Sequence, residues 1–499
     1  MFHSKTFLSV LFGLIAFAQV QHGFSLVGPN APWQTTGIGY TAPVPGSMGG
    51  APMNLDEEYR WNVPSVHYGF TADFLNFAGV RGTEEVEKAI AILNDLPPAD
   101  NINIDDYPLE SLRMNHRAQA LGILDLKSHA LQFLTVSMGI ADPTRYVYTI
   151  RNRWVVNNVT NYLVTMRNFD PVTWEYTPFV NGTLYTYEIV EPYLPGIAVA
   201  VNTPVDPLDQ LLPRTLPVSA DSSLGFAGFP PGSFYTGLTR DDVAGLKYIY
   251  RSSNYNTETA LADISGAGGG IAGGLGGGSG IADFPGTVTS PGGGVYDFPF
   301  LITTNAPAAG GGVGAGAGQG VTTNAFINPA IRAGREKISF LRSDYDSLIG
   351  AFFQPLTVRF SENVLTNGNF RSQTLVRTVV QPDYIFDAAD LQGNDAGPGG
   401  AISFSVSTTA NWLSSDTFDG TTGDDDGPGI ITPSATFTFN NVGPLFQNFQ
   451  ADGQFFLREG DLGSAPLVVW GSYDGTTNAP IIYPNRVTIE DLERLVGTQ

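Results

Sequence analysis

A long glycine-rich stretch constrains this chain more than any other feature of its sequence. Between Gly266 and Gly320, 21 of 55 residues are glycine, which is too many for a packed core and typical of a linker. A chain of 499 residues also exceeds one ordinary core, so we expect two folded regions. The predicted boundaries are a signal peptide at 1–25, an extended arm at 26–54, a first domain at 55–256, the linker at 257–325 and a second domain at 326–499.

The N-terminus has the pattern of a secretory signal. Lys5 supplies a positive charge, and a short apolar run extends from Thr6 to Val20. Small residues allow cleavage after either Ala18 or Ser25. The run is too short for a membrane span, so we expect a secreted protein, extracellular or at the cell surface, with no membrane span.

The charge balance excludes some partners and favours others. The net charge of −22, from 47 carboxylates and 25 cations, repels nucleic acid. Cations are the natural ionic partners of such a chain, and calcium is the one expected outside the cell. The absence of cysteine excludes disulfides, thiol nucleophiles and thiolate metal sites.

The first domain mixes helix and strand signals. Helices are predicted at 84–94, at 115–138 and after the capping-box pattern that begins at Thr239. Strands are predicted at 65–70, 145–156, 162–168 and 183–190, and their order lacks strict β-α-β alternation. This pattern predicts an α+β domain.

The second domain shows alternation of apolar and polar residues at period two, in short runs separated by turn residues. Examples are Leu356–Phe360, Ala401–Ser407, Ala435–Phe439 and Leu467–Trp470. Runs of this kind predict an all-β, sandwich-like domain.

Three pieces of the first domain resemble a matrixin-type metalloprotease, one branch of the metzincins. The run Tyr59–Pro64 leading into Val66–Phe70 looks like the opening strand of that fold. A helix at 84–94 follows, as in the family, and Leu238–Tyr250 looks like the closing helix. The resemblance covers about a third of the chain and implies a zinc-protease scaffold.

The zinc-binding motif of that family is not retained. Such enzymes hold zinc with two histidines one helical turn apart and a third beyond a glycine, and a glutamate acts as general base. The nearest match begins at His129, a remnant of the first zinc position, with Ala130 in place of the base. Phe133 and Gly139 occupy the other two ligand positions. The chain is therefore either a degenerate, non-catalytic relative or an unrelated α+β domain.

Two further sets of residues in the second domain are candidate sites. A glycine-rich loop carries acids that suit calcium, although their spacing is not that of an EF-hand. Aromatic rings in the strands either form a platform for a carbohydrate or are buried in the sandwich, which is the commoner arrangement. The candidate calcium residues are Asp416, Asp419, Asp424, Asp425 and Asp426, and the candidate ligand-binding aromatics are Trp412, Trp470 and Tyr473.

These observations favour a secreted non-catalytic protein that binds a surface, a matrix or a ligand, a pseudo-metalloprotease rather than an enzyme. Its expected partner is an extracellular glycan, a protein or another copy of the chain, because strand edges can pair with other chains. The alternative is a secreted peptidase or glycosidase with an unrecognised active site. A Ser-His-Asp triad is recognised by geometry, so the sequence leaves this alternative open.

Overall fold

The structure is a computed structural model that contains both helices and strands. It describes residues 22–28, 33–40, 51–191, 197–211, 214–220, 231–258, 260–261, 263–266, 326–327, 330–343, 354–366, 368–380, 382–386, 469–483 and 488–490, and the backbone of 402–406, 410–412, 429–431, 435–439, 447–449 and 455–457. The candidate calcium residues between Asp416 and Asp426, and the glycine-rich stretch from 267 to 325, lie outside the described residues.

Among the described residues, five α-helices and three short 3-10 helices lie in the first half of the chain. They are α2 (Ala72–Asn94), α3 (His116–Ala120), α4 (Leu126–Ser137), α5 (Pro207–Leu211), α6 (Arg240–Tyr250), η1 (Thr36–Ile38), η2 (Ala99–Asn101) and η3 (Ile104–Asp106). The capping box predicted at Thr239 is confirmed, because Thr239 and Asp242 satisfy each other's backbone at the start of α6.

The other two predicted helices differ in extent. α2 begins at Ala72, twelve residues earlier than predicted, where Thr71 caps it, and Gly79 kinks it with a φ of 63°. The helix predicted at 115–138 is wrong as a single helix. Gly122, with a φ of +68°, ends its first turns, and a short strand precedes α4.

Strands occur on both sides of the glycine-rich stretch. Before it lie β1 (Phe24–Gly28), β2 (Ala51–Pro52), β3 (Ser65–Phe70), β4 (Leu112–Met114), β5 (Ile123–Asp125), β6 (Ile140–Ala141), β7 (Tyr148–Val156), β8 (Val159–Met166), β9 (Asn168–Phe169), β10 (Phe179–Val180), β11 (Thr183–Val190), β12 (Val199–Pro204), β13 (Ser233–Tyr235), β14 (Tyr255–Glu258) and β15 (Ile264–Gly266). After it lie β16 (Ala330–Ala333), β17 (Ser339–Arg342), β18 (Leu356–Thr366), β19 (Asn369–Val379), β20 (Tyr384–Phe386), β21 (Ile402–Val406), β22 (Ala410–Trp412), β23 (Gly429–Ile431), β24 (Ala435–Phe439), β25 (Gln447–Phe449), β26 (Phe455–Leu457), β27 (Val469–Ser472) and β28 (Ile481–Ile482).

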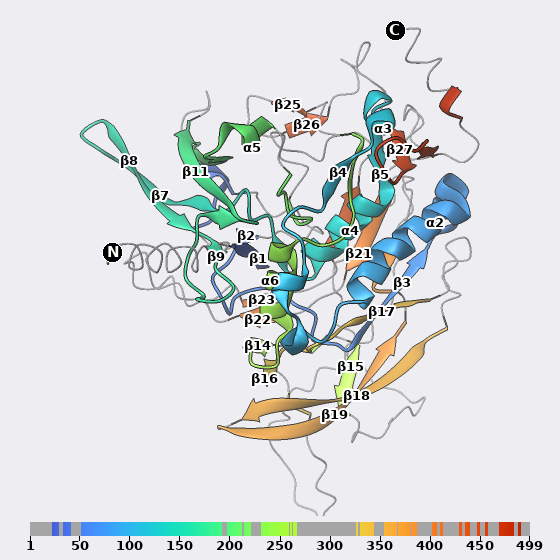
Figure 1. Cartoon of the computed structure of the whole chain (residues 1–499). Coiled ribbons are helices and arrows are strands. Elements are labelled where there is room, and N and C mark those ends of the chain that lie inside the picture. The colour runs from blue at the N-terminus through green and yellow to red at the C-terminus, as the bar shows by residue number, and fades with distance from the viewer. Residues whose placement is uncertain are drawn as a thin grey trace, which may run out of the picture.

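Strands from the two sides of the glycine-rich stretch share sheets (Figure 1). β3 lies between β17 and β20 and pairs with both in parallel. β5 pairs in parallel with β27, near the C-terminus. β14 and β15 join β16, β18 and β19 in a five-stranded sheet of order β14-β16-β18-β19-β15. The described residues therefore leave the predicted two-domain layout unconfirmed.

The hydrophobic core is shared in the same way. Trp61 and Phe74 belong to one buried cluster with Tyr384, Phe386 and Trp470. Phe70 of β3 stacks on Phe386 of β20 with ring centroids 5.3 Å apart, and Trp61 donates a hydrogen bond from Nε1 to the Tyr384 hydroxyl at 3.0 Å. Segments more than 300 residues apart in the sequence thus stabilise each other by burial.

The start of the predicted arm is a strand rather than an exposed tail. All five residues of β1 are buried, and the strand pairs with β2, β6 and β9. Phe24 packs against Phe169, Trp174 and Tyr248. An apolar strand that is covered on both sides must be part of the core.

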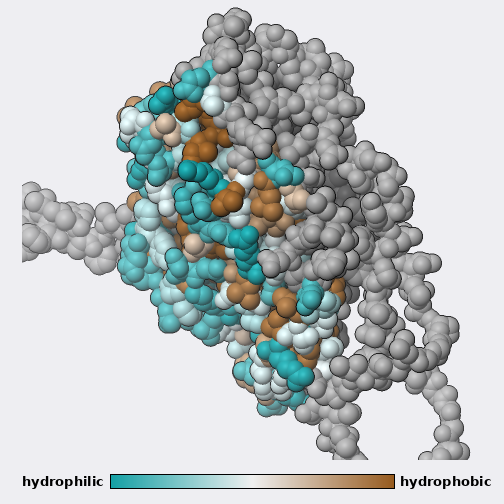
Figure 2. All heavy atoms as spheres, turned by 90° about the vertical axis from the view of Figure 1, so that its right-hand side faces the viewer, coloured by the Kyte–Doolittle hydropathy of each residue, from teal (hydrophilic) through white to brown (hydrophobic). Residues whose placement is uncertain are grey.

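The described helices include none that is both long and apolar enough to cross a membrane. Figure 2 looks onto the side of the molecule that carries α2, at the right of Figure 1. Hydrophobic residues appear in its coloured surface as small patches separated by hydrophilic ones.

Candidate functional site

Helix α4 is the place where the resemblance would put catalytic machinery. Asp125, the last residue of β5, caps the helix by accepting a hydrogen bond from the Ser128 backbone N–H at 3.0 Å. The Ser128 hydroxyl in turn accepts a hydrogen bond from the Tyr235 backbone N–H at 2.8 Å. Burial raises the pKa of the Asp125 carboxyl to about 6, although Lys127 and Ser128 favour its charged form.

His129 lies in the core rather than in an open site. Its ring contacts Trp470 of β27 edge to face, with centroids 4.8 Å apart. Burial lowers the pKa of the imidazole to about 3, so the ring is neutral at physiological pH. A neutral ring packed on an aromatic face contributes to the core as an apolar group does.

The other positions of the degenerate motif are also filled by core contacts. Phe133 packs perpendicular to Tyr384 at 5.9 Å. Gly139 has a φ of +107°, and a Cβ there would lie 2.1 Å from the Tyr59 carbonyl oxygen. Within the described residues, no three His, Cys, Asp or Glu side chains come together as a metal site would require.

A serine and a histidine do meet elsewhere, at the edge of β3. The Ser343 hydroxyl lies 3.0 Å from Nδ1 of His67. Asp383 accepts a hydrogen bond from the His67 backbone N–H at 2.8 Å, so this carboxylate does not orient the ring as a triad carboxylate does. Both Ser343 and His67 are buried, and burial lowers the His67 pKa. Together with Arg377, which binds Asp383, these residues fasten β3 to its neighbours.

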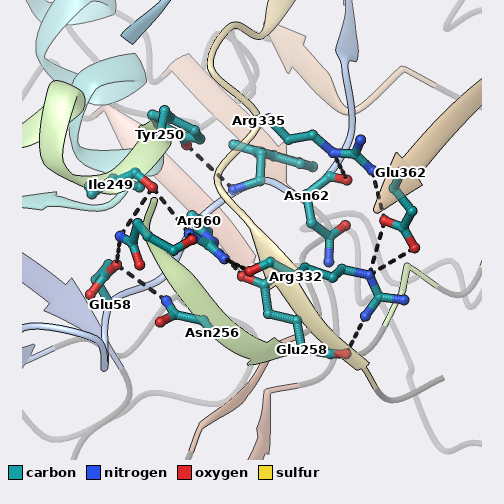
Figure 3. A network of polar contacts seen from close by, with 12 residues as sticks. Glu58, Arg60, Asn62, Ile249, Tyr250, Asn256, Glu258, Arg332, Arg335 and Glu362 are labelled. Atoms are coloured by element: carbon teal, nitrogen blue, oxygen red, sulfur yellow. Dashed lines mark hydrogen bonds and ion pairs between the residues drawn. The ribbon is translucent and has the colours of Figure 1, made fainter. Parts of the chain in front are cut away.

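A buried network of ion pairs and hydrogen bonds surrounds Arg60 (Figure 3). Arg60 binds the Glu258 carboxylate and donates to the carbonyls of Ile249 at 3.2 Å, Asn254 at 3.0 Å and Arg332 at 2.8 Å. These acceptors belong to α6, the loop after it, β14 and β16, so one guanidinium holds four segments together.

The network continues on both sides of Arg60. Arg332 donates from Nε to both Glu362 oxygens at 3.1 Å, and Arg335 adds a second ion pair to the same carboxylate at 3.0 Å. On the other side Glu58 accepts from Asn254 at 2.7 Å and Asn256 at 3.2 Å. Burial is the main cause that raises the Glu58 pKa, and nearby Arg60 opposes it.

This network has the composition of a structural clamp. Three arginines, Arg60, Arg332 and Arg335, face the three glutamates Glu58, Glu258 and Glu362, so the fully charged cluster is neutral. A balanced, buried cluster resists taking up a further ion, because added charge would be uncompensated. The network aligns the five-stranded sheet with α6, and we assign it no reaction on a substrate.

The predicted aromatic platform does not exist at Trp470 and Tyr473. Trp470 is fully buried, and the Tyr473 hydroxyl donates to the carbonyls of Ile123 and Ser233 at 3.0 Å each. A sugar stacks only on an exposed ring, so these two residues supply no platform. Trp412 ends β22, whose backbone alone is described.

Comparisons with known proteins found no matching protein-family model, no matching curated protein and no matching solved structure. The Arg60 network was not predicted from the sequence. Its residues lie apart in the sequence, and no spacing of Arg and Glu signals that they will meet.

Replacing His129 with phenylalanine should change the acid stability of the protein. The folded pKa of His129 lies below its unfolded value of about 6.5, so its stabilising contribution is complete above that pH and is lost as the pH falls toward 3. Relative to wild type, His129→Phe should therefore gain about 1.4 kcal/mol of unfolding free energy per pH unit of acidification below 6.5. Urea unfolding from pH 7 to pH 4 measures this, and Asp125 titrates in both proteins.

The matched control is His116→Phe, because His116 is exposed. A difference between His129→Phe and wild type that stays constant with pH would contradict a buried, neutral His129.

Two substitutions should distinguish the contributions of Glu58 and Glu258 to the ion network. Glu58→Gln keeps the acceptor for Asn254 and Asn256 and removes a carboxyl whose raised pKa costs stability as the pH rises. The free energy of unfolding of Glu58→Gln relative to that of wild type should therefore be higher at pH 8 than at pH 4.

Arg60→Met leaves Glu258 buried without its ion pair and should cost about 3–5 kcal/mol of unfolding free energy. Equal losses for both variants in urea unfolding would contradict this assignment.

Proposed function

We propose that this chain is a secreted, non-catalytic protein that binds a surface, a matrix or a ligand, built on a degenerate metzincin-like scaffold. The observation that carries the proposal is the packing of α4. Its His129 and Phe133 contact core aromatics, where an enzyme of that family needs an open zinc site. Side chains that fill a core cannot also present a bound water to a substrate.

The scaffold part of the proposal has support from local structure. β3 has the bounds expected for the opening strand, and α6 has the capping box and the buried face expected for the closing helix. If the domain is instead an unrelated α+β fold, the burial around α4 argues only against a zinc site at His129.

We also propose an all-β, sandwich-like unit for part of the second region. The support is three antiparallel strand pairs between 402 and 457, formed by β21 with β24, β22 with β23 and β25 with β26. Short antiparallel pairs are the building elements of a sandwich.

A secreted hydrolase is the alternative, and the contact between Ser343 and His67 is the one observation that favours it. The burial of both residues weighs against it, because a nucleophile has to reach a substrate. The ring nitrogen that faces away from Ser343, Nε2, is buried and has no hydrogen-bond partner among the described residues. A triad requires a carboxylate at that nitrogen.

Metal analysis and hydrolysis assays on the purified mature protein test the proposal. We expect no stoichiometric zinc, no chelator-sensitive peptide cleavage and no labelling by a serine-directed fluorophosphonate probe. Stoichiometric zinc that disappears in His129→Gln would overturn the proposal in favour of a metalloprotease. Labelling that disappears in Ser343→Ala would overturn it in favour of a serine hydrolase.

The burial of β1 supports one of the two proposed signal-cleavage sites over the other. Cleavage after Ser25 would cut β1 and remove Phe24 from the core. Large-to-small changes at such core positions cost about 3–5 kcal/mol of unfolding free energy, so this cleavage would destabilise the protein. It would also remove Gly23, whose N–H donates to the buried Asp241 carboxylate at 3.1 Å. Cleavage after Ala18 keeps all of these contacts.

The mature protein should therefore begin at Gln19. Intact-mass measurement and N-terminal sequencing of the exported protein check this. A protein that begins at Leu26 and still unfolds at the same temperature as one that begins at Gln19 would contradict the role assigned to β1.

A further inference from the structure

The hairpin formed by β7 and β8 projects from the body of the molecule, at the upper left of Figure 1. Asn157 and Asn158 form its two-residue turn, with φ values of 52° and 61°, which suits the tight turns that join antiparallel strands. The base of β7 is buried, and the outer part from Asn152 to Val156 is largely exposed. Among the described strands, β8 pairs with β7 alone.

One face of the projecting part carries four apolar side chains beside two asparagines and no charge. Val156 pairs with Val159, Trp154 with Asn161 and Asn152 with Leu163, so these side chains point to the same side of the hairpin. The exposed fractions are 51% for Val156, 61% for Val159, 42% for Trp154 and 39% for Leu163. An exposed apolar surface of this kind marks an interaction site when its members are contiguous.

The opposite face has a different character. Val155 pairs with Thr160, and Arg153 pairs with Tyr162. Arg153 also forms an ion pair with Glu191 at 2.7 Å. The charge of the projecting part is therefore on this face and is compensated there, which leaves the Trp154 face without charge.

The distribution of charge over the chain indicates what can cover the Trp154 face. The stretch from Pro143 to Phe169 contains four arginines and no aspartate or glutamate, in a chain of net charge −22. Elsewhere, carboxylates would repel a second copy of so acidic a chain. On this hairpin two copies can meet without facing carboxylates.

The projection strengthens this argument. Five residues of strand extend about 17 Å, which is about twice the Debye length of ~8 Å at physiological ionic strength. The acidic bodies of two copies would be largely screened from each other when their hairpins touch.

We propose that two copies of this chain associate through their β7–β8 hairpins, with the Trp154 faces packed against each other. The contact is isologous, since each copy contributes the same face to the other. Four side chains a copy make a small interface, so the association is weak and depends on concentration. This inference rests on the proposed function, because it selects self-association among its possible partners.

Adjacent valines provide a matched pair of variants. Val156 and Val155 are similarly exposed, at 51% and 56%, but point to opposite faces of the hairpin. Val156→Lys places a charge on the proposed interface, whereas Val155→Lys places it on the Arg153 face. Val80→Lys, at a 73% exposed position in α2, is the distant control.

Sedimentation equilibrium of the full mature protein over a hundredfold concentration range tests the proposal. Wild type, Val155→Lys and Val80→Lys should dimerise, and Val156→Lys should weaken the association at least tenfold. Raising sodium chloride from about 0.01 M, where the Debye length is ~30 Å, to about 0.15 M should strengthen the wild-type dimer, because it screens the net charge and leaves apolar packing intact. Wild type that stays monomeric at the highest concentration, or equal effects of Val155→Lys and Val156→Lys, would overturn the proposal.

A second measurement tests the proposal if Val156→Lys folds poorly. The chain contains no cysteine, so Leu163→Cys introduces a single thiol on the Trp154 face and Val155→Cys a single thiol on the other face. Mild oxidation should cross-link Leu163→Cys into a covalent dimer faster than Val155→Cys. Equal rates would overturn the proposal. Neither result alters the zinc and hydrolysis assays, so failure of this inference is distinguishable from failure of the proposed function.

Discussion

The buried guanidinium of Arg60 is the interaction on which the packing of distant segments depends. It sits where α6 ends and where β14 meets β16, and its hydrogen bonds reach the backbone of these segments. A buried cation is unfavourable unless each N–H finds an acceptor and its charge is paired. Glu258 supplies the charge, and the carbonyls supply the remaining acceptors. Such a site is satisfied in one arrangement only, so it fixes how the five-stranded sheet meets the helical part.

The second constraint is the parallel pairing of β3 with β17 and β20. These strands come from opposite sides of the glycine-rich stretch, and Gly266 and Ala330 are 64 residues apart. Closing a long loop costs little more than closing a moderate one, because the entropy loss grows with the logarithm of length. Burial of Phe70 on Phe386 and of Trp61 on Tyr384 offsets that loss. A long glycine-rich segment is therefore compatible with a shared core.

The same shared core explains why candidate site residues became structural ones. β27 pairs with β5 and brings Trp470 onto His129, and β20 brings Tyr384 onto Phe133. The residues at the zinc positions of the resembled family are thus covered by strands from the C-terminal half. The β7–β8 hairpin, at the upper left of Figure 1, instead exposes its Trp154 face.

The sequence by itself determined the elements whose signals are local. The bounds of β3 and β11 and the capped start of α6 followed from alternation and from a capping box, because neighbouring residues alone satisfy those patterns. Only the tertiary structure decided which strands flank β3, that Trp470 and Tyr473 are buried, and that Arg60 meets Glu258 and Arg332. The physical reason is that burial and parallel pairing depend on partners hundreds of residues away. Local periodicity shows that a side chain needs a cover, but it carries no information about which segment provides it.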